Sequence, residues 1–514
     1  MPYVMPGFAL AKAAADAFET RPGLEGLVLL NHGLFSFGAT ARESYERTIT
    51  LVTAAEAFIE RRGTAIRGAP KASGAPPAAH ILPVLRGVLA RGGEGRRPSR
   101  WIFDRRATPE IMTLVDHPRL GEWAGRGVAT PDHVIRTKRQ PLVLPRPAED
   151  LDGWRGEAEQ ALGAYIADYE AYFARNAARA GGGKVPLDPL PRVLAVPGVG
   201  LIGVGRNAGD AAVAADIAQS WAATLLRAEA VGRFAPLGEA DTFDMEYWSL
   251  EQAKLGQVRE RRLERHVAVV TGGGGVIGAA IATAFAAEGA QVAVLDIDGD
   301  AAERVARAQG RHALAIACDV TDGEAVARAF AAVCARFGGV DIVASNAGAA
   351  NTGMIADLPP ETLRAGFDLN FFAHQTIAQA AVRVMRAQSM GGVLLFNASK
   401  QAVNPGPDFG AYGAPKAALL ALMRQYALEH GADAIRVGAV NPDRIRSGLL
   451  TEAMVGARAA ARGLAPEAYM AGNLLGEEVT AEDVAQAFVF AALMEKTTGA
   501  VIPVDGGNVA AMMR

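Results

Sequence analysis

The sequence predicts an α/β protein whose C-terminal half is a doubly wound parallel sheet. Two observations support this fold class. From about residue 265 to the C-terminus, short runs of β-branched and other apolar residues alternate with alanine-rich helical stretches, the pattern of parallel strands covered by helices on both faces. In the front half, two segments each show short strands around a glycine turn, followed by a helix. A chain of 514 residues is too long for one hydrophobic core, so we expect several domains.

The composition excludes several functional classes. The formal net charge of -3 leaves no broad basic surface for nucleic acid, and we interpret the arginine-rich stretch 91–106 as a solvated loop. No apolar run reaches the ~18 residues of a membrane-spanning helix, and the start MPYVMPGF lacks the features of a secretory signal. Two cysteines, Cys318 and Cys334, supply neither a disulfide framework nor a cysteine metal cluster. We therefore expect a cytoplasmic protein with no membrane or nucleic-acid partner.

The first strand-glycine-helix unit occupies residues 26–60. Its last part has the apolar spacing of a helix, and the Gly-, Pro- and Ala-rich stretch RRGTAIRGAPKASGAPP that follows indicates a linker near residue 65. The second unit, LAVPGVGLIGVGRNAGDAAVAADIAQSW, aligns with the first at a constant offset, with Gly33 opposite Gly200 and Ala41 opposite Ala208. We interpret this correspondence as an internal repeat.

The second unit also contains a glycine pattern that is often taken for a dinucleotide-binding fingerprint. Gly198, Gly200 and Gly203 spell G-x-G-x-x-G, but that fingerprint binds phosphate only where its glycines end a strand and open a helix. Here Val204 and Gly205 follow before a helix can begin. We therefore predict a β-hairpin at this position rather than a nucleotide site.

The stretch VAVVTGGGGVIGAAIATAF has glycines in the required context. Val267 to Val270 reads as a buried strand from its β-branched composition, and Ala279 to Ala287 reads as a helix without a breaker. Between them, Gly272, Gly275 and Gly278 recur at every third position. The first glycine permits a tight turn, the second lets a pyrophosphate approach the backbone, and the third lets the helix pack closely on the strand.

A second strand, Gln291 to Leu295, ends in Asp296. This is the position from which a carboxylate binds the ribose 2′-hydroxyl of an adenosine. A carboxylate there also repels a 2′-phosphate, so the sequence predicts NAD rather than NADP as the cofactor. We include Ile277, beside the third glycine, among the predicted cofactor-binding residues.

A pair of residues suited to moving a proton follows downstream. Tyr412 and Lys416 lie four positions apart at the start of a helical stretch, which places both on one face. A free tyrosine, with a pKa of about 10, is a poor base at neutral pH, whereas a nearby cation lowers that pKa. Of nine tyrosines, Tyr412 alone has a lysine at this spacing. Ser399 ends the strand VLLFNAS, where its hydroxyl can polarise a substrate oxygen.

The order of these motifs resembles the short-chain dehydrogenase/reductase family over residues 265–514. The pattern comprises the glycine loop, an Asp-Val pair, Asn-Ala-Gly, a helical Asn, a Ser and Tyr-x-x-x-Lys, with VIPVDGG near the end. The additional positions are Asp319 and Val320 after the strand ALAIAC, Asn346, Ala347 and Gly348 after the strand DIVAS, and Asn370 in GFDLNFFAHQ.

The resemblance implies a role for each residue. Tyr412 would be the acid/base, Lys416 would hold the nicotinamide ribose and lower the tyrosine pKa, and Ser399 would orient the substrate. Asn370 would anchor a proton-relay water. The remaining family positions would line the cofactor, with Asp319 and Val320 beside the adenine, followed by Asn346, Ala347 and Gly348.

Three positions depart from the family pattern. The loop TGGGGVIG has Val276 at its sixth position and fits TGxxGxxG, the spacing of the extended relatives, instead of the common TGxxxGxG. Pro415 removes an N–H inside Tyr-x-x-x-Lys, which is tolerable only in the first turn of a helix. Asp443 stands where the family usually has glycine, in the loop that meets the nicotinamide. We expect these three residues to affect cofactor geometry.

The front of the chain resembles the end of a class II aldolase of the L-fuculose/L-rhamnulose phosphate type, through PYVMPGFALAKAAADAF and the segment around LLNHGLFSFG. Over its whole length, including DTFDMEYWSLEQAKL, the chain resembles the bifunctional rhamnulose-1-phosphate aldolase/short-chain dehydrogenase family. The resemblance implies four parts: a truncated class II aldolase-like segment at 1–65, a degenerate aldolase-like domain at 66–235, a connector at 236–264, and a Rossmann-type NAD-binding domain at 265–514.

The aldolase half of that family binds zinc through an HxH pair and a third histidine in the NHG turn. His32 matches the third ligand, but none of the eight histidines forms an HxH pair, and the repeat places Val199 opposite His32. Zinc sites need about three protein ligands. We therefore predict no zinc in this chain, regard His32 as a remnant ligand and expect the front of the chain to be truncated.

These features predict an NAD-dependent oxidoreductase that transfers hydride between NAD and a small hydroxy-aldehyde or alcohol. The resemblance links the substrate to lactaldehyde in rhamnose catabolism, and an aldehyde would be oxidised as its hydrate. Two alternatives remain: a bifunctional aldolase/dehydrogenase whose metal site is completed by another chain, and a front half that is purely structural. We also expect a homo-oligomer, and we expect the segment from Asn441 to about Leu475 to set the substrate specificity.

Overall fold

The computed structural model describes residues 1–21, 23–64, 66, 76–90, 98–254 and 260–508. The predicted linker near residue 65, the arginine-rich stretch and the predicted connector fall partly outside these residues. The chain divides into two compact units. Unit 1 comprises Met1–Pro76, Asp104–Val204 and Asp210–Arg259, and unit 2 comprises Pro77–Phe103, Gly205–Gly209 and Glu260–Arg514. Among the described residues, no helix has both the length and the apolar character needed to cross a bilayer.

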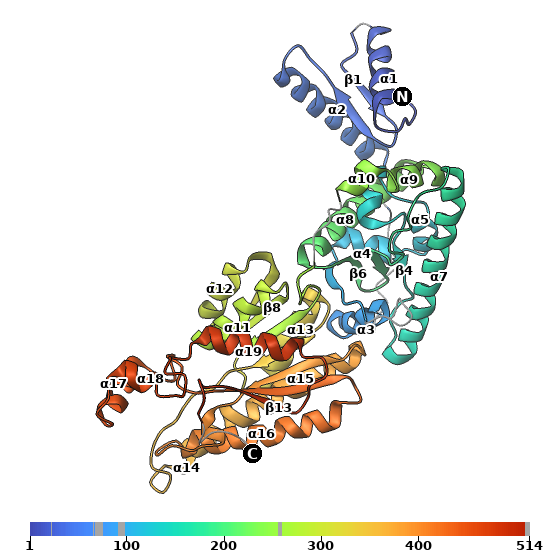
Figure 1. Cartoon of the computed structure of the whole chain (residues 1–514). Helices are drawn as coiled ribbons and strands as arrows, with labels where there is room; N and C mark the ends of the chain where they lie inside the picture. Colours follow the sequence, from blue (N-terminus) through green and yellow to red (C-terminus); the bar gives the residue numbers. More distant parts are fainter. Residues whose placement is uncertain (22, 65, 67–75, 91–97, 255–259, 509–514) are drawn as a thin grey trace. The chain divides into compact units, whose positions relative to one another are not determined.

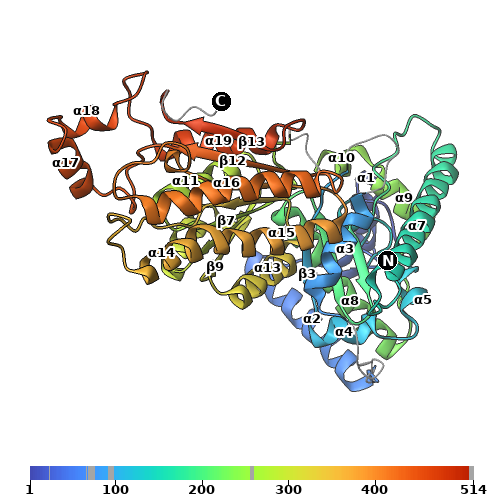
Figure 2. The same ribbon diagram turned by 90° about the horizontal axis from the view of Figure 1, so that it is seen from below.

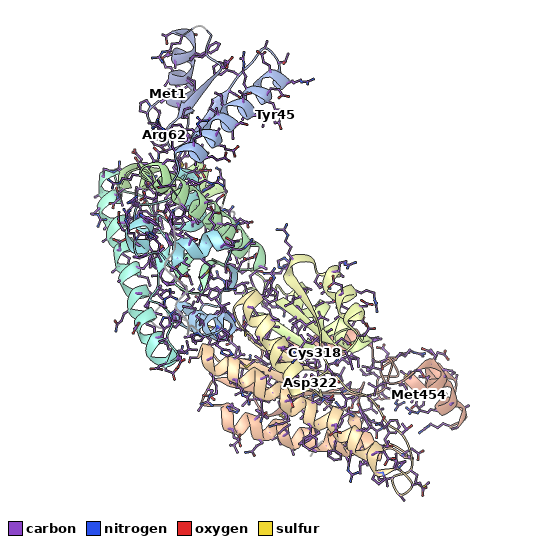
Figure 3. The ribbon with its side chains drawn as sticks, turned by 180° about the vertical axis from the view of Figure 1, so that it is seen from behind. Met1, Tyr45, Arg62, Cys318, Asp322 and Met454 are labelled. Carbon is purple, nitrogen blue, oxygen red and sulfur yellow. The ribbon has the colours of Figure 1, made fainter. Side chains whose placement is uncertain are left out.

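The front of unit 1 is a helix, a hairpin and a long helix: α1 (Phe8–Glu19), β1 (Gly26–Leu29), β2 (Gly33–Ser36) and α2 (Ala41–Arg62) (Figure 1). β1 and β2 pair antiparallel. Thr40 caps α2 because its hydroxyl accepts a hydrogen bond from an amide of the first turn. Leu29 is buried, whereas Phe35 on β2 and Tyr45 on α2, which is labelled in Figure 3, are exposed.

The rest of unit 1 is built on a four-stranded sheet with the strand order β3-β6-β5-β4. Its apolar core includes Trp123, Trp221 and Leu225. The elements are β3 (Ile102–Arg106), α4 (Pro109–Val115), α5 (Leu120–Ala124), η1 (Pro131–His133), α6 (Val134–Thr137), β4 (Leu142–Val143), α7 (Leu151–Arg179), β5 (Val193–Val196), β6 (Gly200–Gly205), α8 (Ala208–Val231), α9 (Glu239–Glu246) and α10 (Ser249–Ala253).

The glycine pattern in this sheet is a hairpin, as predicted. β5 and β6 pair antiparallel, with Val196 opposite Gly200. Gly203 faces α8 so closely that a Cβ there would lie 2.2 Å from the carbonyl oxygen of Ala211. Gly203 therefore serves the packing of α8 on the hairpin, and the pattern does not open a helix toward a phosphate.

The internal repeat is also visible in the structure. In the two repeats, equivalent elements begin at the same offset. The first strands begin at Gly26 and Val193, the second strands at Gly33 and Gly200, and the helices at Ala41 and Ala208. Gly33 and Gly200 also share a positive φ, 140° and 129° respectively. The two segments are therefore structurally equivalent hairpin-helix units.

Unit 2 contains a seven-stranded sheet with the strand order β13-β12-β11-β10-β7-β8-β9. All of its pairings are parallel. The order reverses between β7 and β10, as in a doubly wound Rossmann fold. The strands are β7 (Val267–Thr271), β8 (Gln291–Asp296), β9 (Ala313–Ala317), β10 (Ile342–Ser345), β11 (Gly392–Asn397), β12 (Ile435–Pro442) and β13 (Ala500–Val504).

Helices cover both faces of this sheet. Figure 1 shows α11 and α19 along one face and α15 and α16 along the other. Between α11, α19 and the sheet lies a core that includes Val270, Phe285 and Phe488. The helical elements are α11 (Val276–Ala287), α12 (Gly299–Ala308), η2 (Gly310–His312), α13 (Gly323–Phe337), α14 (Pro360–Phe367), η3 (Asp368–Phe372), α15 (Ala373–Gln388), η4 (Lys400–Ala402), α16 (Gly410–His430), α17 (Glu452–Ala460), α18 (Pro466–Met470) and α19 (Ala481–Leu493).

One helix from the front half of the sequence belongs to unit 2. α3 (Ala78–Ala90) packs on α13 and α15, as Figure 2 shows, although the sequence predicted a separate domain at 66–235. Its residues 81–90 are all buried, including Arg86. A helix that is apolar on most of its surface is stable only inside a core, and α13 and α15 supply that core.

The segment after β12 folds as the short helices α17 and α18. Leu450, Val455 and Tyr469 form a small apolar cluster there, and Met454, labelled in Figure 3, packs against it. Arg444 joins this segment to the end of β12, because its guanidinium donates hydrogen bonds to the carbonyl oxygens of Tyr469 and Gly472.

Candidate active site

The carboxyl ends of β7 and β10 meet at the point where the strand order of the sheet reverses. In open α/β sheets, ligands bind in the crevice outside this point. The loop after β7 contains the predicted glycines, and the loop after β10 contains the predicted Asn-Ala-Gly. Topology therefore brings two of the predicted motifs to one place.

Of the five glycines in this loop, four are close-packed and one, Gly275, is open. Gly272 has φ 60°, a conformation that favours glycine. A Cβ on Gly278 would lie 2.0 Å from the carbonyl oxygen of Gly272, and one on Gly273 would lie 2.6 Å from Val294. Gly275, in contrast, is exposed, and its Cβ would meet nothing closer than 3.5 Å. The loop therefore presents bare backbone at Gly275 while its other glycines serve its own packing.

α11 begins directly after this open position. Gly275 is its N-cap and no side chain caps its first turn, so the first amides of the helix point outward without a partner in the helix. The side chain of Ile277 packs against the core, and its amide belongs to the first turn of α11. Val276, the departure from the common loop, is exposed at the first helical position. An amide-rich helix start of this kind binds phosphate.

Asp296 lies beside the glycine loop at the end of β8. Its Oδ2 accepts a hydrogen bond from the amide of Gly274 at 2.9 Å, and its Oδ1 accepts one from the amide of Asp298 at 3.0 Å. The carboxylate is half-buried and has further lone pairs for a ligand. The structure thus brings Asp296 and the loop together, as the predicted ribose contact requires.

A threonine and two asparagines join the loops after β7, β10 and β11. The Thr271 hydroxyl accepts hydrogen bonds from the amides of Asn346 and Ala347, at 2.9 and 3.1 Å. The Asn346 side chain donates to the carbonyl oxygens of Thr271 and Gly272, and accepts from Asn397 at 2.7 Å. Asn346 and Ala347 therefore hold the crevice in shape through a chain of hydrogen bonds.

Asp319 and Val320 follow β9, away from this chain of hydrogen bonds. Asp319 Oδ1 accepts from the amide and hydroxyl of Thr321, at 2.9 and 2.7 Å, and these bonds hold the pKa of Asp319 below its usual range. Val320 is buried. The carboxylate of Asp319 is thus engaged in a local turn.

Tyr412, Lys416 and Ser399 come together on the other side of the crevice. Tyr412 and Lys416 share one face of α16, and Lys416 Nζ lies 5.9 Å from the centre of the Tyr412 ring. Ser399 follows the end of β11, and its hydroxyl forms a hydrogen bond with the Tyr412 phenol. Lys416 Nζ donates to the carbonyl oxygen of Asn397 at 2.8 Å, which ties α16 to β11.

Burial dominates the protonation of this group. It raises the pKa of Tyr412, while the hydrogen bond with Ser399 lowers it in part. Burial also lowers the pKa of Lys416 to about 7. The sequence predicted a lowered tyrosine pKa. In the folded chain the net shift of the Tyr412 pKa is upward, because burial withdraws the phenolate from water.

Asn370 lies in the π-helical turn η3, where the sequence predicted ordinary helix. Its amide nitrogen donates to the carbonyl oxygens of Ala349 and Gly366, at 2.9 and 3.1 Å. Its Oδ1 is buried, and no donor among the described residues bonds to it. Gly348 lies beside both Asn370 and Lys416: a Cβ there would lie 2.8 Å from Asn370 Oδ1 and 3.5 Å from Lys416 Nζ. π-Turns inside helices are frequent at functional sites.

Residues that the sequence analysis did not select complete the site. Thr271 and Asn397 link the loops, and His374 contacts Lys416 at 3.3 Å. His374 follows Asn370 by four residues, so helical spacing was a signal that both could face the same site. Thr271 and Asn397 had no signal of their own, because strand-end polar residues are common in this fold class.

Two departures from the family pattern have structural consequences. α16 begins at Gly410, so Pro415 lies in the second turn and not in the first, where we expected it to be tolerated. Its missing N–H leaves the carbonyl oxygen of Ala411 without its helical donor, and Gly366 makes room for that oxygen: a Cβ there would lie 2.3 Å from it. Asp443 is buried between Arg444, Asn508 and Lys400, at 3.4, 3.3 and 4.0 Å.

These features fit a nicotinamide dinucleotide. Open backbone at Gly275 and the uncapped start of α11 suit a pyrophosphate, and Asp296 suits a ribose. Three buried amide oxygens, those of Asn370, Asn397 and Asn441, have no donor among the described residues. A buried acceptor without a donor is unfavourable, so this edge of the sheet is suited to receive hydrogen-bond donors from a bound molecule.

His32 lies in unit 1. Its Nε2 is 2.9 Å from the carbonyl oxygen of Val4, and its ring stacks on Tyr3 with centroids 4.9 Å apart. Within the part of the chain that the structure describes, no three His, Cys, Asp or Glu side chains are grouped as metal ligands.

Comparisons with known families divide the chain into three parts. Residues 1–59 match the class II aldolase and adducin N-terminal domain, and residues 76–255 match the second domain of class II aldolases. Residues 274–508 match the enoyl-(acyl carrier protein) reductase model of short-chain dehydrogenases.

Relatives exist both for the whole chain and for its C-terminal half. An uncharacterized oxidoreductase of Bacillus subtilis, YuxG, is 32% identical over 541 residues, covering 100% of this chain and 77% of the relative. (+)-Borneol dehydrogenase 1 of Salvia officinalis is 35% identical over 256 residues, covering 48% of this chain and 95% of the relative. A short-chain dehydrogenase/reductase structure from Mycobacterium marinum shares 31% identity with a TM-score of 0.45, covering 48% of this chain and 96% of that one.

The fold of unit 2, the motifs at its crevice, the family models and the sequence relatives agree. The protein is an oxidoreductase, in agreement with the dehydrogenase and reductase names of its relatives. The chain belongs to the family in which class II aldolase domains precede a short-chain dehydrogenase/reductase domain.

Proposed function

We propose that this enzyme transfers hydride between NAD and a small hydroxy-aldehyde or alcohol. The observation that carries the proposal is the arrangement of the buried Ser399 and Lys416 around the half-buried Tyr412 at the edge of the crevice. A phenol hydrogen-bonded to a serine hydroxyl and placed near a lysine is suited to exchange the proton of a carbinol hydroxyl. The resemblance to the rhamnulose-1-phosphate aldolase/dehydrogenase family makes lactaldehyde, in rhamnose catabolism, the proposed substrate.

The cofactor, when bound, supplies the acceptor or donor of the hydride. The residues of the chain manage the proton and the geometry. Ser399 orients the reacting oxygen, Tyr412 takes or returns its proton, and Lys416 holds a ribose hydroxyl and favours the phenolate whenever its amine is charged. Asn370, with an unpaired amide oxygen facing this region, holds the water of a proton relay.

An aldehyde substrate would react as its hydrate, whose hydroxyl Tyr412 can deprotonate. The two cysteines do not favour the other common route, a thiohemiacetal. Cys318 and Cys334 are buried, and burial raises the pKa of both thiols, to about 12 for Cys334. The thiolate is the nucleophilic form, so both are poorly suited to attack a carbonyl.

We propose NAD rather than NADP because of Asp296. Its carboxylate lies against the glycine loop and would repel a 2′-phosphate. Titration should show that NAD binds more tightly than NADP. Asp296→Ala should reduce the difference between the two affinities, because it weakens NAD binding and removes the repulsion of the 2′-phosphate of NADP. Asp300→Ala, an exposed carboxylate in the first turn of α12, is the matched control and should leave both affinities unchanged. Equal affinities in the wild-type enzyme would argue against the assignment.

Tyr412→Phe tests the reaction itself. We expect kcat to fall by about a hundred- to ten-thousand-fold, the usual contribution of a general acid/base, while the dissociation constant for NAD stays within about twofold. The assay follows NADH absorbance with C3 to C6 hydroxy-aldehydes and polyols. Tyr426→Phe, a buried tyrosine on the same helix, should keep wild-type turnover. Unchanged turnover in Tyr412→Phe would rule out the proposed role.

We also propose that the protein forms a homo-oligomer. Light scattering of the full chain would measure its mass and test this proposal. Cytoplasmic location remains a prediction from composition.

A further inference from the structure

His374 is a buried histidine behind the catalytic lysine. It lies near the start of α15, directly after the π-turn that carries Asn370, and is 1% exposed. Its Nδ1 is 2.6 Å from the Ser345 hydroxyl at the end of β10, and its Nε2 is 3.3 Å from Lys416 Nζ. The edge of the Phe396 ring covers it, with centroids 6.1 Å apart. Both ring nitrogens are therefore engaged, and one of them contacts the lysine of the site.

When Lys416 is protonated, its contacts favour one tautomer of His374. The Lys416 ammonium has three N–H donors and no acceptor. One donor goes to the Asn397 carbonyl oxygen and a second is directed at His374, so Nε2 accepts. The imidazole proton is then on Nδ1 and is donated to Ser345 Oγ. The third donor of Lys416 remains for the crevice.

We propose that His374 is a positioning residue for the Tyr412–Lys416 pair: its neutral imidazole accepts a hydrogen bond from the Lys416 ammonium, keeps that amine charged and aimed, and so sets the pH at which Tyr412 takes the substrate proton. This inference rests on the proposed function of the same site and adds a residue to it.

Charge and burial around the pair are consistent with this role. Burial, and after it the Lys416 cation, hold the pKa of His374 well below its usual range, so the ring stays neutral and can accept. Among the described residues, Lys416 on α16 is the charged group that faces His374. The other faces are closed by Ser345 on β10 and Phe396 on β11.

Loss of the hydrogen-bond acceptor on His374 should change the pKa of Lys416 in one direction. Burial already lowers the pKa of Lys416 to about 7, and removal of a hydrogen bond to its charged form lowers that pKa further. Lys416 is then neutral at the working pH, and its cation no longer favours the Tyr412 phenolate. A hydrogen bond to a charged group corresponds to about one to two pKa units. The rising limb of alcohol oxidation should therefore move to higher pH.

The experiment compares two variants of His374 in the full chain. His374→Leu fills the space without an acceptor, and His374→Gln restores an amide oxygen that can take the hydrogen bond. We expect the pH profile of kcat/KM to shift upward by about one to two units in His374→Leu and to return most of the way in His374→Gln. NAD affinity should change little. His430→Gln, which alters a histidine paired with Asp433 at the far end of α16, should leave the profile unchanged.

Two outcomes would overturn the proposal. The first is an unshifted profile in a folded His374→Leu enzyme. The second is an equal loss of rate in both variants with the wild-type profile, which is what a purely structural role produces.

A second measurement does not depend on activity or on the stability of a variant. Nitrogen NMR of the wild-type imidazoles, with His374 assigned from the His374→Gln spectrum, should show the proton on Nδ1. A proton on Nε2 overturns the proposal. If NAD-dependent turnover is absent with every substrate, the proposed function fails, while the tautomer and an NMR titration of Lys416 still decide whether His374 holds this amine.

Discussion

Lys416 illustrates how strongly a single buried residue can be committed to function. It is 2% exposed, and burial lowers its pKa to about 7. Two hydrogen-bond partners compensate for the loss of hydration of its amine: the Asn397 carbonyl oxygen at 2.8 Å and a His374 ring nitrogen at 3.3 Å. A buried amine with so few partners costs folding free energy, which is the usual trade-off between stability and activity at a catalytic site.

Lys416→Met should therefore stabilise the protein near neutral pH while abolishing turnover. Between pH about 7 and about 10, the unfolded chain keeps this lysine protonated and the folded chain does not. The unfolded state then binds more protons, so the free energy of unfolding of the wild type rises with pH over this interval. The advantage of Lys416→Met, on the order of a few kcal/mol, should be largest below pH 7 and shrink toward pH 10. Urea denaturation at several pH values measures it, and an advantage that grows with pH would contradict this account.

At the residue scale, the sequence was most informative where spacing alone implies proximity. Tyr412 and Lys416 are four apart on one helix, and the structure puts them on one face. Ser399 was a candidate from its position at a strand end, whereas Asn370 could be assigned only through the family resemblance, since its neighbours come from other elements. His374 was not among the predicted site residues, because its contact with Lys416 depends on how α15 and α16 pack.

At the scale of elements, different glycines of the same loop serve helix packing and cofactor binding. Gly278 allows α11 to lie against the Gly272 carbonyl, whereas Gly275 has open space where a side chain would be. Two glycines of the same motif, three residues apart, should therefore respond differently to the same substitution.

Gly278→Ala and Gly275→Ala test this difference. A Cβ on Gly278 would lie 2.0 Å from a backbone oxygen, so we expect a loss of stability of about 1–3 kcal/mol from overpacking. Gly275→Ala should keep the melting temperature and weaken NAD binding, because its methyl group occupies the surface offered to the pyrophosphate. Gly163→Ala, in α7 with nothing within 4 Å, is the control and should change neither quantity for the worse. Equal effects at 275 and 278 would count against this division of roles.

The π-turn η3 and the proline of α16 are features that propensity did not predict. Helical spacing around Asn370 predicted ordinary helix, and the rule for proline placed Pro415 in a first turn. In the structure, Gly366 of α14 lies against the Ala411 carbonyl that Pro415 leaves free. A neighbouring helix therefore decides what this helix can tolerate, and local rules do not include that neighbour.

At the scale of the whole molecule, the dehydrogenase unit depends on a helix from the other half of the sequence. Arg86 of α3 is completely buried and pairs with Asp341 at 2.8 Å, while it also donates to Gln388. Burial tends to raise the pKa of Asp341, but Arg86 and Arg100 hold it at about 2. Asp341 also accepts from the amide of Val267 at 2.8 Å. The network thus fixes the amino ends of β7 and β10, whose carboxyl ends form the crevice.

Arg86→Met should destabilise unit 2, although it lies outside the predicted dehydrogenase domain. Removing one partner of a buried ion pair typically costs about 3–5 kcal/mol, and here Arg86→Met leaves the buried Asp341 carboxylate with Arg100 as its remaining cation. Denaturation of the full chain, followed by loss of NAD binding, measures the effect. Arg307→Met breaks an exposed pair with Glu303 on α12 and should cost less than about 1 kcal/mol. A matching small cost at Arg86 would show that α3 is not part of this fold.

The sequence by itself determined the fold class, the alternation of strands and helices, the hairpin behind the false fingerprint and the identity of the principal motifs, because each is encoded in residues close together along the chain. Tertiary structure alone decided which side chains meet: the pairing of Lys416 with His374, the links through Thr271 and Asn397, and the insertion of Arg86 beneath the sheet. These contacts join elements tens to hundreds of residues apart. Their existence depends on the packing of helices against a common sheet, which no local pattern specifies.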